Sequence, residues 1–499
     1  MFQSIGIRKP KKNKFNLSHD VKLSFNMGQL VPVLTEEIVP GDSFKVTSEV
    51  MLRLAPMVAP IMHKVDVYMH YFFVPNRLIW DDWEDFITGG EDGTAAPVWP
   101  HYSMDYLYNA GFISKGHLSD YLGLPPQTSN PTNDQNVSAL PFRAYTTIWN
   151  EYYRDQNIVG PATVDKTSGS QVGSAVLVNR VRAWEKDYFT SALPWAQRGD
   201  SVTIPGVIDY STHSDVVMGT GASAGVLDVR ANGELNASAP PAQTNFGRIE
   251  NLDDIGIDIN DLRRSSALQR WLELAARGGS RYIEQMLSFF GVASSDARLQ
   301  RPEYLGGGKQ HVMISEVLQT AETATTPQGN MAGHGISVGA TNEFTKTFEE
   351  HGFVMGIMSV LPRTAYQEGI HRKWTRSDKF DYYFPQFAHL GEQEIKNREI
   401  YYDGDDDPDD TWGYQSRYAE YKHTQSRVHG DFRDDLNFYH MGRIFGELPG
   451  LDINFIQAAP THRIFANTSV LDDKLWCQVH HNISALRPMP YFGDPRIIG

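Results

Sequence analysis

The two ends of the chain carry the same strand pattern, and this pattern constrains the fold more than any other feature. Residues 44–54 alternate apolar with polar side chains, the two-residue period of a strand that buries one face. The pattern recurs at residues 65–73 and again, near the end of the chain, at residues 475–485. We therefore expect antiparallel β-structure at both ends, with the first and last strands in one core.

The middle of the chain mixes strands, helices and long loops. Further strands are expected at 311–320, 353–361 and 463–466, and helices with buried apolar stripes at 142–153, 268–275 and 283–290. Stretches rich in turn-forming residues predict irregular chain at 89–100, 125–141, 160–174, 212–244 and 403–410. Strands without a regular βαβ alternation favour a mainly β sandwich, and a single eight-stranded jelly roll with long loop and helix insertions is the leading candidate.

Composition excludes several classes of protein. The chain has 499 residues and one cysteine, Cys477, so an intrachain disulfide framework and a multi-cysteine metal site are both excluded. The longest apolar run, residues 353–361, is far shorter than the roughly 20 residues of a membrane-spanning helix, so no membrane insertion is expected. The first 15 residues do not match a secretory signal peptide, and export is not expected.

Charge is distributed unevenly along the sequence. The net charge is −15, yet five cations and no acid lie within the first 15 residues, which leaves −20 for the rest; these cations are Arg8, Lys9, Lys11, Lys12 and Lys14. A mobile basic arm of this kind can bind nucleic-acid phosphates, but it can equally be a solvated flexible terminus.

Several short motifs resemble catalytic or metal-binding sites without fulfilling their requirements. Residues 221–225 match the GxSxG pattern of a serine nucleophile, but they lack the flanking strand and helix that the pattern needs. Residues 303–310 fail the phosphate-loop pattern. The acidic run 403–410 departs from the EF-hand loop, which favours a solvated loop over a Ca²⁺ site. His63, His70, His480 and His481 are expected to be structural, and we expect no metal, no cofactor and no catalytic residue.

Several segments resemble a known family in their order and spacing. They are residues 15–20, 27–32, 39–42, 57–60, 70–77 with Trp80, 140–153, 186–195 and 488–495. Together these segments resemble the major capsid protein of the microviruses, small tailless bacteriophages with single-stranded DNA, and specifically the gokushovirus-like branch.

The resemblance implies a structural protein of the virion rather than an enzyme. It implies a jelly roll that self-assembles into a T=1 icosahedral shell around circular single-stranded DNA, in the cytoplasm of a bacterial host. It further implies as partners a small basic DNA-binding virion protein, a pilot protein and a bacterial surface receptor.

The same resemblance divides the chain into five parts. They are a basic arm and extended lead-in (1–40), first jelly-roll strands with insertions (41–205), a variable surface protrusion (206–260), remaining jelly-roll strands (261–487) and a C-terminal arm (488–499). The protrusion is expected to contact the host through Val217, Met218, Gly219, Ala222, Val226 and Leu227. The C-terminal arm is expected to dock on a neighbouring subunit through Pro490, Tyr491, Phe492 and Arg496.

One function from another class remains open. A carbohydrate-binding or carbohydrate-active jelly roll would need paired carboxylates beside a cleft, and the nearest candidates are Glu349 with Glu350 and Glu392 with Glu394.

Overall fold

The computed structural model describes residues 11–130, 135–200, 217–218, 225–229, 235–238, 259–279, 281–293, 295–318, 331–404 and 407–491. The chain divides into two compact units. The first consists of Met1–Ala196 together with Gly278–Gly499, and the second of Gln197–Arg277.

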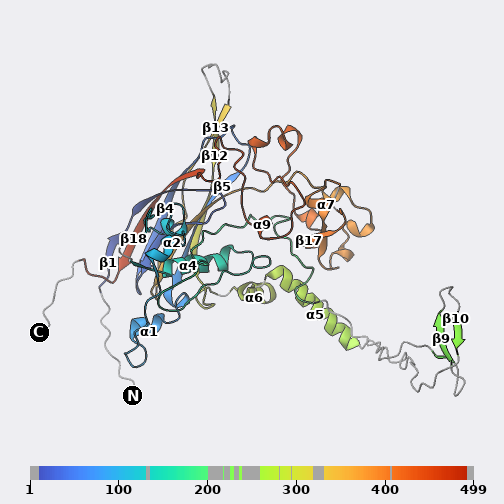
Figure 1. Ribbon diagram of the computed structural model, residues 1–499, viewed down its shortest axis with the longest axis horizontal. Helices are drawn as coiled ribbons and strands as arrows, with labels where there is room; N and C mark the ends of the chain where they lie inside the picture. The colour runs from blue at the N-terminus through green and yellow to red at the C-terminus, as the bar shows by residue number, and fades with distance from the viewer. Residues whose placement is uncertain are drawn as a thin grey trace. The chain divides into compact units, whose positions relative to one another are not determined.

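The first unit is built on two antiparallel sheets (Figure 1). The seven-stranded sheet has the order β1 (Asn13–Asn16), β18 (Leu475–Arg487), β4 (Ser43–Leu54), β13 (Met331–Ala340) and β12 (Met313–Leu318), with β2 (His19–Phe25) on β18 and β14 (Phe344–Thr347) on β4. The four-stranded sheet has the order β11 (Glu303–His311), β5 (Val65–Pro75), β15 (Gly352–Pro362) and β3 (Val31–Ile38). The strands expected at 44–54, 65–73, 353–361 and 475–485 are confirmed, and the chain is mainly β.

One apolar core joins the two sheets. Alternate residues of β4 and β18 meet alternate residues of β5 and β15, together with residues of β3, in a single buried cluster. On β4 and β18 the residues between them are half-buried or exposed, which is why these two strands alternate so regularly in the sequence.

Helices cover the other face of the four-stranded sheet. Phe72 and Val74 of β5, with Phe353, Met355 and Ile357 of β15, pack in a second buried cluster with residues of α2 (Met104–Asn109) and α4 (Leu140–Ile148). Strand β15 is therefore buried along its whole length, which explains its uninterrupted apolar sequence.

Short helices complete this second cluster and its surroundings. They are η1 (Asn76–Leu78), α1 (Trp83–Thr88), α3 (Leu118–Tyr121) and the π-helical η2 (Trp149–Tyr153) that continues α4. The aromatic stripe expected at 142–153 is confirmed as core, because Phe142, Tyr145, Trp149 and Tyr153 are all buried. Strands β6 (His101–Ser103) and β7 (Asn136–Ser138) pair beside them. Helix α6 (Tyr282–Phe290) confirms a helix at 283–290, but Leu287 and Phe290 of its apolar stripe are exposed instead of buried.

A loop-rich part of the first unit has its own small core. Its elements are β16 (Gln393–Lys396), β17 (Thr411–Gln415), α7 (Asn397–Ile400), α8 (Ala419–Lys422) and α9 (Ile453–Ile456), with 3₁₀ turns η5 (Arg372–Trp374), η6 (Lys379–Asp381), η7 (Pro385–Phe387), η8 (Gly430–Arg433) and η9 (Asn437–Tyr439). The carboxylate of Asp187 organises it, accepting hydrogen bonds from the hydroxyls of Thr364 (2.6 Å) and Tyr366 (2.8 Å).

The second unit contains a small sheet and a helix. Strands β8 (Val217–Met218), β9 (Gly225–Val229) and β10 (Leu235–Ser238) pair in the order β10-β9-β8, and α5 spans Ile259–Gly278. The expectation of irregular chain throughout 212–244 is therefore wrong. Val226 and Val229 favour a strand, so the sequence does contain a signal for β9. The Gly and Ala residues around them disfavour strands and obscure this signal.

Three other expectations need correction. The strand at 311–320 breaks at buried Val312, where the chain leaves the four-stranded sheet and enters the seven-stranded sheet. Residues 463–466 form a turn with an isolated bridge from Phe465 to Met57, and the guanidinium of Arg463 donates to the carbonyls of Asn437, His440 and Gly442. The helix at 268–275 exists, but Leu268 and Trp271 are about half exposed instead of buried.

A buried polar chain crosses the core between the sheets. His481 of β18 donates from Nε2 to the carbonyl of Val33 (2.9 Å), so its Nδ1 accepts the hydroxyl proton of Ser48 (2.7 Å). The hydroxyl of Tyr71 on β5 donates in turn to Ser48 Oγ (2.6 Å). Burial lowers the pKa of His481 to about 4, because a charged imidazolium would lose water without gaining a carboxylate.

We expect the His481 site to make folding sensitive to acid. The folded pKa is about 4 and the usual value is 6.5, so the unfolded chain takes up the proton first and stability falls as pH decreases from 6.5 to 4. The full shift corresponds to about 3 kcal/mol. Denaturant unfolding at pH 7 and pH 4 should show a smaller decrease for His481→Gln than for the wild type. His423→Gln, at an exposed position, should keep the wild-type decrease, and equal decreases in all three proteins would contradict the assignment.

Candidate functional site

The two ends of the described chain meet along β1. Residues 13–16 pair with residues 484–487 of β18, and Asn13 Nδ2 donates to the carbonyl of Met489 (2.7 Å). The hydroxyl of Tyr491 donates to the carbonyl of Lys14 (2.7 Å), and its ring centre lies 5.1 Å from that of Phe15. We call residues 13–16, 41–42 and 484–491 the terminal junction.

A buried ion pair anchors the terminal junction. The Nε of Arg487 lies 3.2 Å from Oδ2 of Asp42, whose side chain is fully buried, and the same carboxylate oxygen accepts the backbone N–H of Val39. The guanidinium also lies 5.1 Å from the ring centre of Phe44. Removing the cation would leave a buried carboxylate without its charge partner.

The basic cluster is partly fixed on this junction. Lys11, Lys12 and Lys14 are exposed, Lys14 lies in β1, and Lys12 Nζ donates to the carbonyl of Gly41. A mobile arm is therefore wrong for residues 13–16, because strand pairing with β18 holds them. Arg8 and Lys9, like Phe492 and Arg496 at the other end, lie outside the described residues.

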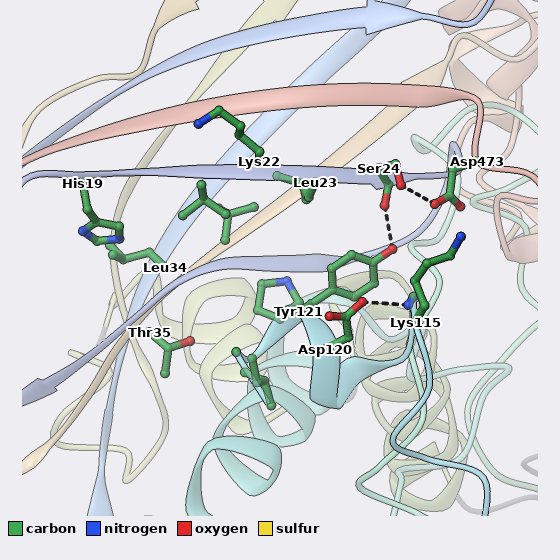
Figure 2. Close-up of a pocket in the computed structure, with 16 residues that line it drawn as sticks. His19, Lys22, Leu23, Ser24, Leu34, Thr35, Lys115, Asp120, Tyr121 and Asp473 are labelled. Atoms are coloured by element: carbon green, nitrogen blue, oxygen red, sulfur yellow. Dashed lines mark hydrogen bonds between the residues drawn. The ribbon is translucent and has the colours of Figure 1, made fainter. Parts of the chain in front are cut away.

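A groove of about 440 Å³ lies between the edges of the two sheets (Figure 2). Strand β2 lines one side and strand β3 the other, while residues 115–123 of the α3 region form the floor. Among the described strands, β2 pairs with β18 alone and β3 with β15 alone, so each strand has one edge without a strand neighbour. Such edges are places where a further chain can add.

Hydrogen bonds fix one end of the groove. Figure 2 shows Ser24 Oγ donating to Asp473 (2.5 Å) and the hydroxyl of Tyr121 donating to the carbonyl of Ser24 (2.8 Å). Burial raises the pKa of Tyr121, so its hydroxyl remains a donor across the physiological range. The α3 region is thereby held against β2, and the groove has a firm wall.

The chain is similar to known capsid proteins over nearly its whole length. A family model described as capsid protein (F protein) matches residues 4–497. The protein is 35% identical to capsid protein VP1 of Chlamydia phage 1, over 97% of this chain and 95% of that protein. It is 35% identical to capsid protein VP1 of Bdellovibrio phage phiMH2K (98% and 96% covered) and 30% identical to that of Spiroplasma virus 4 (97% and 95%).

The chain belongs to this capsid protein family. The resemblance to capsid proteins of gokushovirus-like microviruses is confirmed, and the protein is a structural virion component that forms a homo-oligomeric shell. As a capsid protein it is not an enzyme.

The terminal junction and the groove are accordingly surfaces of a shell subunit. Among the residues that the structure describes, no helix combines the length and apolar character of a membrane span.

The surface-insertion residues fall on the second unit. Val217 and Met218 lie in β8, and Val226 and Leu227 lie in β9, where Val217 and Val226 are partners across the two strands. Gly219 and Ala222 lie outside the described residues, as does most of the GxSxG motif. The backbone register brings four of the six predicted residues into one small sheet.

The four histidines singled out in the sequence each form a hydrogen bond within the fold. His63 bonds the carbonyl of Arg363 (2.6 Å), His70 bonds the hydroxyl of Tyr153 (2.8 Å), and His480 pairs with Asp20 (2.8 Å) on the face opposite buried His481. Within the described ranges, no three His, Cys, Asp or Glu side chains gather as metal ligands would.

The acidic loop is only partly described. Asp409 pairs with Arg398 (2.7 Å), while Asp405 and Asp406 lie outside the described residues.

One carboxylate of each pair considered for a carbohydrate enzyme is bound to a cation. Glu350 accepts two hydrogen bonds from Arg77 (2.5 and 2.9 Å). Glu394 lies 2.8 Å from Lys396, whose ammonium holds the pKa of that carboxyl below its usual value. A general acid needs the opposite shift, so the capsid protein offers no support for the carbohydrate alternative at these positions.

We expect the Arg487–Asp42 pair to hold the terminal junction. Arg487→Met should lower the free energy of unfolding by about 3 kcal/mol, because Asp42 would remain buried without its cation. Asp42→Asn in the same background should recover part of this loss in denaturant titrations.

Lys12→Met provides the matched control, since Lys12 is an exposed cation next to the terminal junction. It should change the free energy of unfolding by no more than about 0.5 kcal/mol. Equal losses for the two single variants would contradict a special role for the buried pair.

Proposed function

We propose that this capsid protein folds as a jelly roll and builds a T=1 icosahedral shell around circular single-stranded DNA. The observation that carries the proposal is the match to capsid proteins over nearly the whole chain. The two-sheet core supports the jelly roll, because strands from both chain ends lie in the same sheet and connections pass between the two sheets.

Shell contacts are proposed at the terminal junction and the groove. Tyr491 is 60% exposed although it contacts β1, so most of its ring remains available to a neighbouring subunit together with Pro490, Phe492 and Arg496. The unpaired edges of β2 and β3 provide backbone donors and acceptors for an extended segment from another copy.

The basic cluster is proposed to bind DNA phosphates. Arg8, Lys9, Lys11, Lys12 and Lys14 concentrate five cations beside a body of charge −20. Phosphate contacts of this kind neutralise a genome without reading its sequence. A small basic virion protein would share this role, and a pilot protein would complete the particle, which assembles in the host cytoplasm.

The insertion 206–260 is proposed to be the surface protrusion that contacts a bacterial receptor. The division of the chain into two compact units supports this proposal, since an insertion with its own sheet can change without disturbing the shell core.

Deleting residues 217–243 should separate assembly from attachment. We expect the deleted protein to form nuclease-resistant particles of wild-type size in negative-stain micrographs, because the two-sheet core lies outside the deleted segment. The same particles should lose adsorption to host cells.

A matched control replaces Asp409 and Asp410, in an exposed acidic loop of the first unit, with Asn. This variant should adsorb normally. Normal adsorption by the deleted particles would contradict the attachment role, and failure to form shells would contradict the independence of the insertion.

A further inference from the structure

Exposed aromatic rings gather on one part of the first unit. Fourteen Phe, Tyr and Trp side chains are exposed in the described part of the chain, and six of them lie within residues 374–384 or at residue 421 of the loop-rich part. Trp374 is 76% exposed, and the others are between 40% and 53% exposed: Phe380, Tyr382, Tyr383, Phe384 and Tyr421. Exposed rings at this density indicate a surface that receives a partner.

Two segments of this loop-rich part are basic, one on each side of the acidic stretch 391–414. Residues 371–390 and 415–428 carry seven Lys or Arg and three Asp or Glu, a charge of +4 that leaves −19 for the remainder. Arg372 pairs with Glu399 (3.1 Å) and Arg376 with Glu420 (3.4 Å). Within the described ranges, the other five form no ion pair: Lys373, Lys379, Arg417, Lys422 and Arg427.

Buried groups hold the backbone that carries the rings. The hydroxyl of buried Tyr418 donates to the carbonyls of Phe380 and Tyr382 (3.0 Å each), and Arg417 also donates to that of Phe380. Asp381 caps η6 by accepting the backbone N–H groups of residues 377 and 378. Hydrogen bonds therefore fix the backbone that carries the exposed rings, so binding a ligand costs less conformational entropy.

Cations and rings are interleaved across the surface. The guanidinium of Arg376 lies 4.2 Å from the ring centre of Tyr421 and 5.5 Å from that of Tyr382, and the ring centres of Tyr383 and Tyr421 are 6.4 Å apart. The ammonium of Lys373 lies 5.2 Å from the ring of Trp374. We call residues 373–384 with Tyr421 and Lys422 the aromatic–basic surface.

This combination matches single-stranded nucleic acid better than the alternatives. Unstacked bases lie flat on aromatic rings while neighbouring cations bind the phosphates, whereas a duplex hides its base faces. A solvated loop would explain the lysines but not the rings. A subunit contact would explain the rings, but lysine is depleted at such contacts.

We propose that the aromatic–basic surface binds single-stranded DNA without sequence preference. Bases stack on Trp374, Tyr382 and Tyr383, and phosphates pair with Lys373, Lys379 and Lys422. This inference rests on the proposed enclosure of single-stranded DNA and adds a stacking site, distinct from the basic cluster, to it.

The test measures binding of a fluorescent oligothymidine to the full-length, unassembled protein by anisotropy over a range of salt concentrations. The triple variant Trp374→Ala, Tyr382→Ala, Tyr383→Ala should bind at least tenfold more weakly, because stacking is lost. The triple variant Lys373→Gln, Lys379→Gln, Lys422→Gln should reduce the slope of log affinity against log salt by about 2.

Matched controls separate this surface from other rings and charges. Trp476→Ala with Lys22→Gln removes an exposed ring and a cation from neighbouring strands β18 and β2, and should bind like the wild type. Replacing Lys9, Lys11, Lys12 and Lys14 with Gln should reduce the salt slope and leave the aromatic effect unchanged. The triple variant Trp374→Phe, Tyr382→Phe, Tyr383→Phe keeps an aromatic ring at each position and should retain most of the affinity.

The outcomes distinguish this inference from the proposed function. A wild-type protein that binds no oligonucleotide would contradict the enclosure of DNA itself. If the wild type binds DNA and both triple variants bind it equally well, the proposed role of the aromatic–basic surface would be wrong, while the enclosure of DNA would still stand. Variants that bind DNA normally but no longer form shells would assign the surface to subunit contacts, and duplex DNA binding as tightly as single strands would rule out stacking.

Discussion

The pairing of β18 with strands from the start of the chain is the constraint on which the rest of the structure depends. β18 bonds to β1 and β2 along one edge and to β4 along the other, so residues more than 400 positions apart form neighbouring strands. Because the two ends of the chain close the same sheet, the middle can carry helices, loops and the second unit without interrupting it. A shell subunit needs this arrangement, since its core must remain constant while its surface varies.

Polar groups give that pairing its register. A slip of one residue would bring His480 into the core in place of His481 and break the hydrogen bonds to Ser48 and Val33. Arg487 acts similarly at the end of the strand, where only one register brings its guanidinium to buried Asp42. Apolar packing supplies most of the stability of the sandwich, and these few polar contacts select one arrangement of it.

The sequence predicts much of the sandwich because burial on one face produces alternation and burial on both faces produces an apolar run. Strands β4, β5, β15 and β18 follow these rules. The sequence of strand β2 also alternates, with apolar Val21, Leu23 and Phe25, so this strand was predictable from the same pattern. Strand β3 was harder to predict because Pro32 is a residue that strands usually exclude.

The candidate surfaces depend on contacts that no local pattern encodes. The hydroxyl of Tyr491 meets the carbonyl of Lys14, and the groove requires that β2 and β3 lie opposite α3. The aromatic–basic surface does leave a local signal, in the alternation of cations and aromatic residues at 372–387. The sequence does not indicate that these rings are exposed, because their exposure depends on the backbone conformation that the Tyr418 hydroxyl holds through its hydrogen bonds.

The most direct test of the account is a cryo-electron microscopy reconstruction of particles purified from cells that express this chain. We expect a closed T=1 icosahedral shell with one chain in each asymmetric unit, the two-sheet core within the shell wall, and neighbouring subunits in contact at the terminal junction or the groove. A closed shell in which both surfaces face solvent, or a chain that forms no shell under any salt condition, would contradict it.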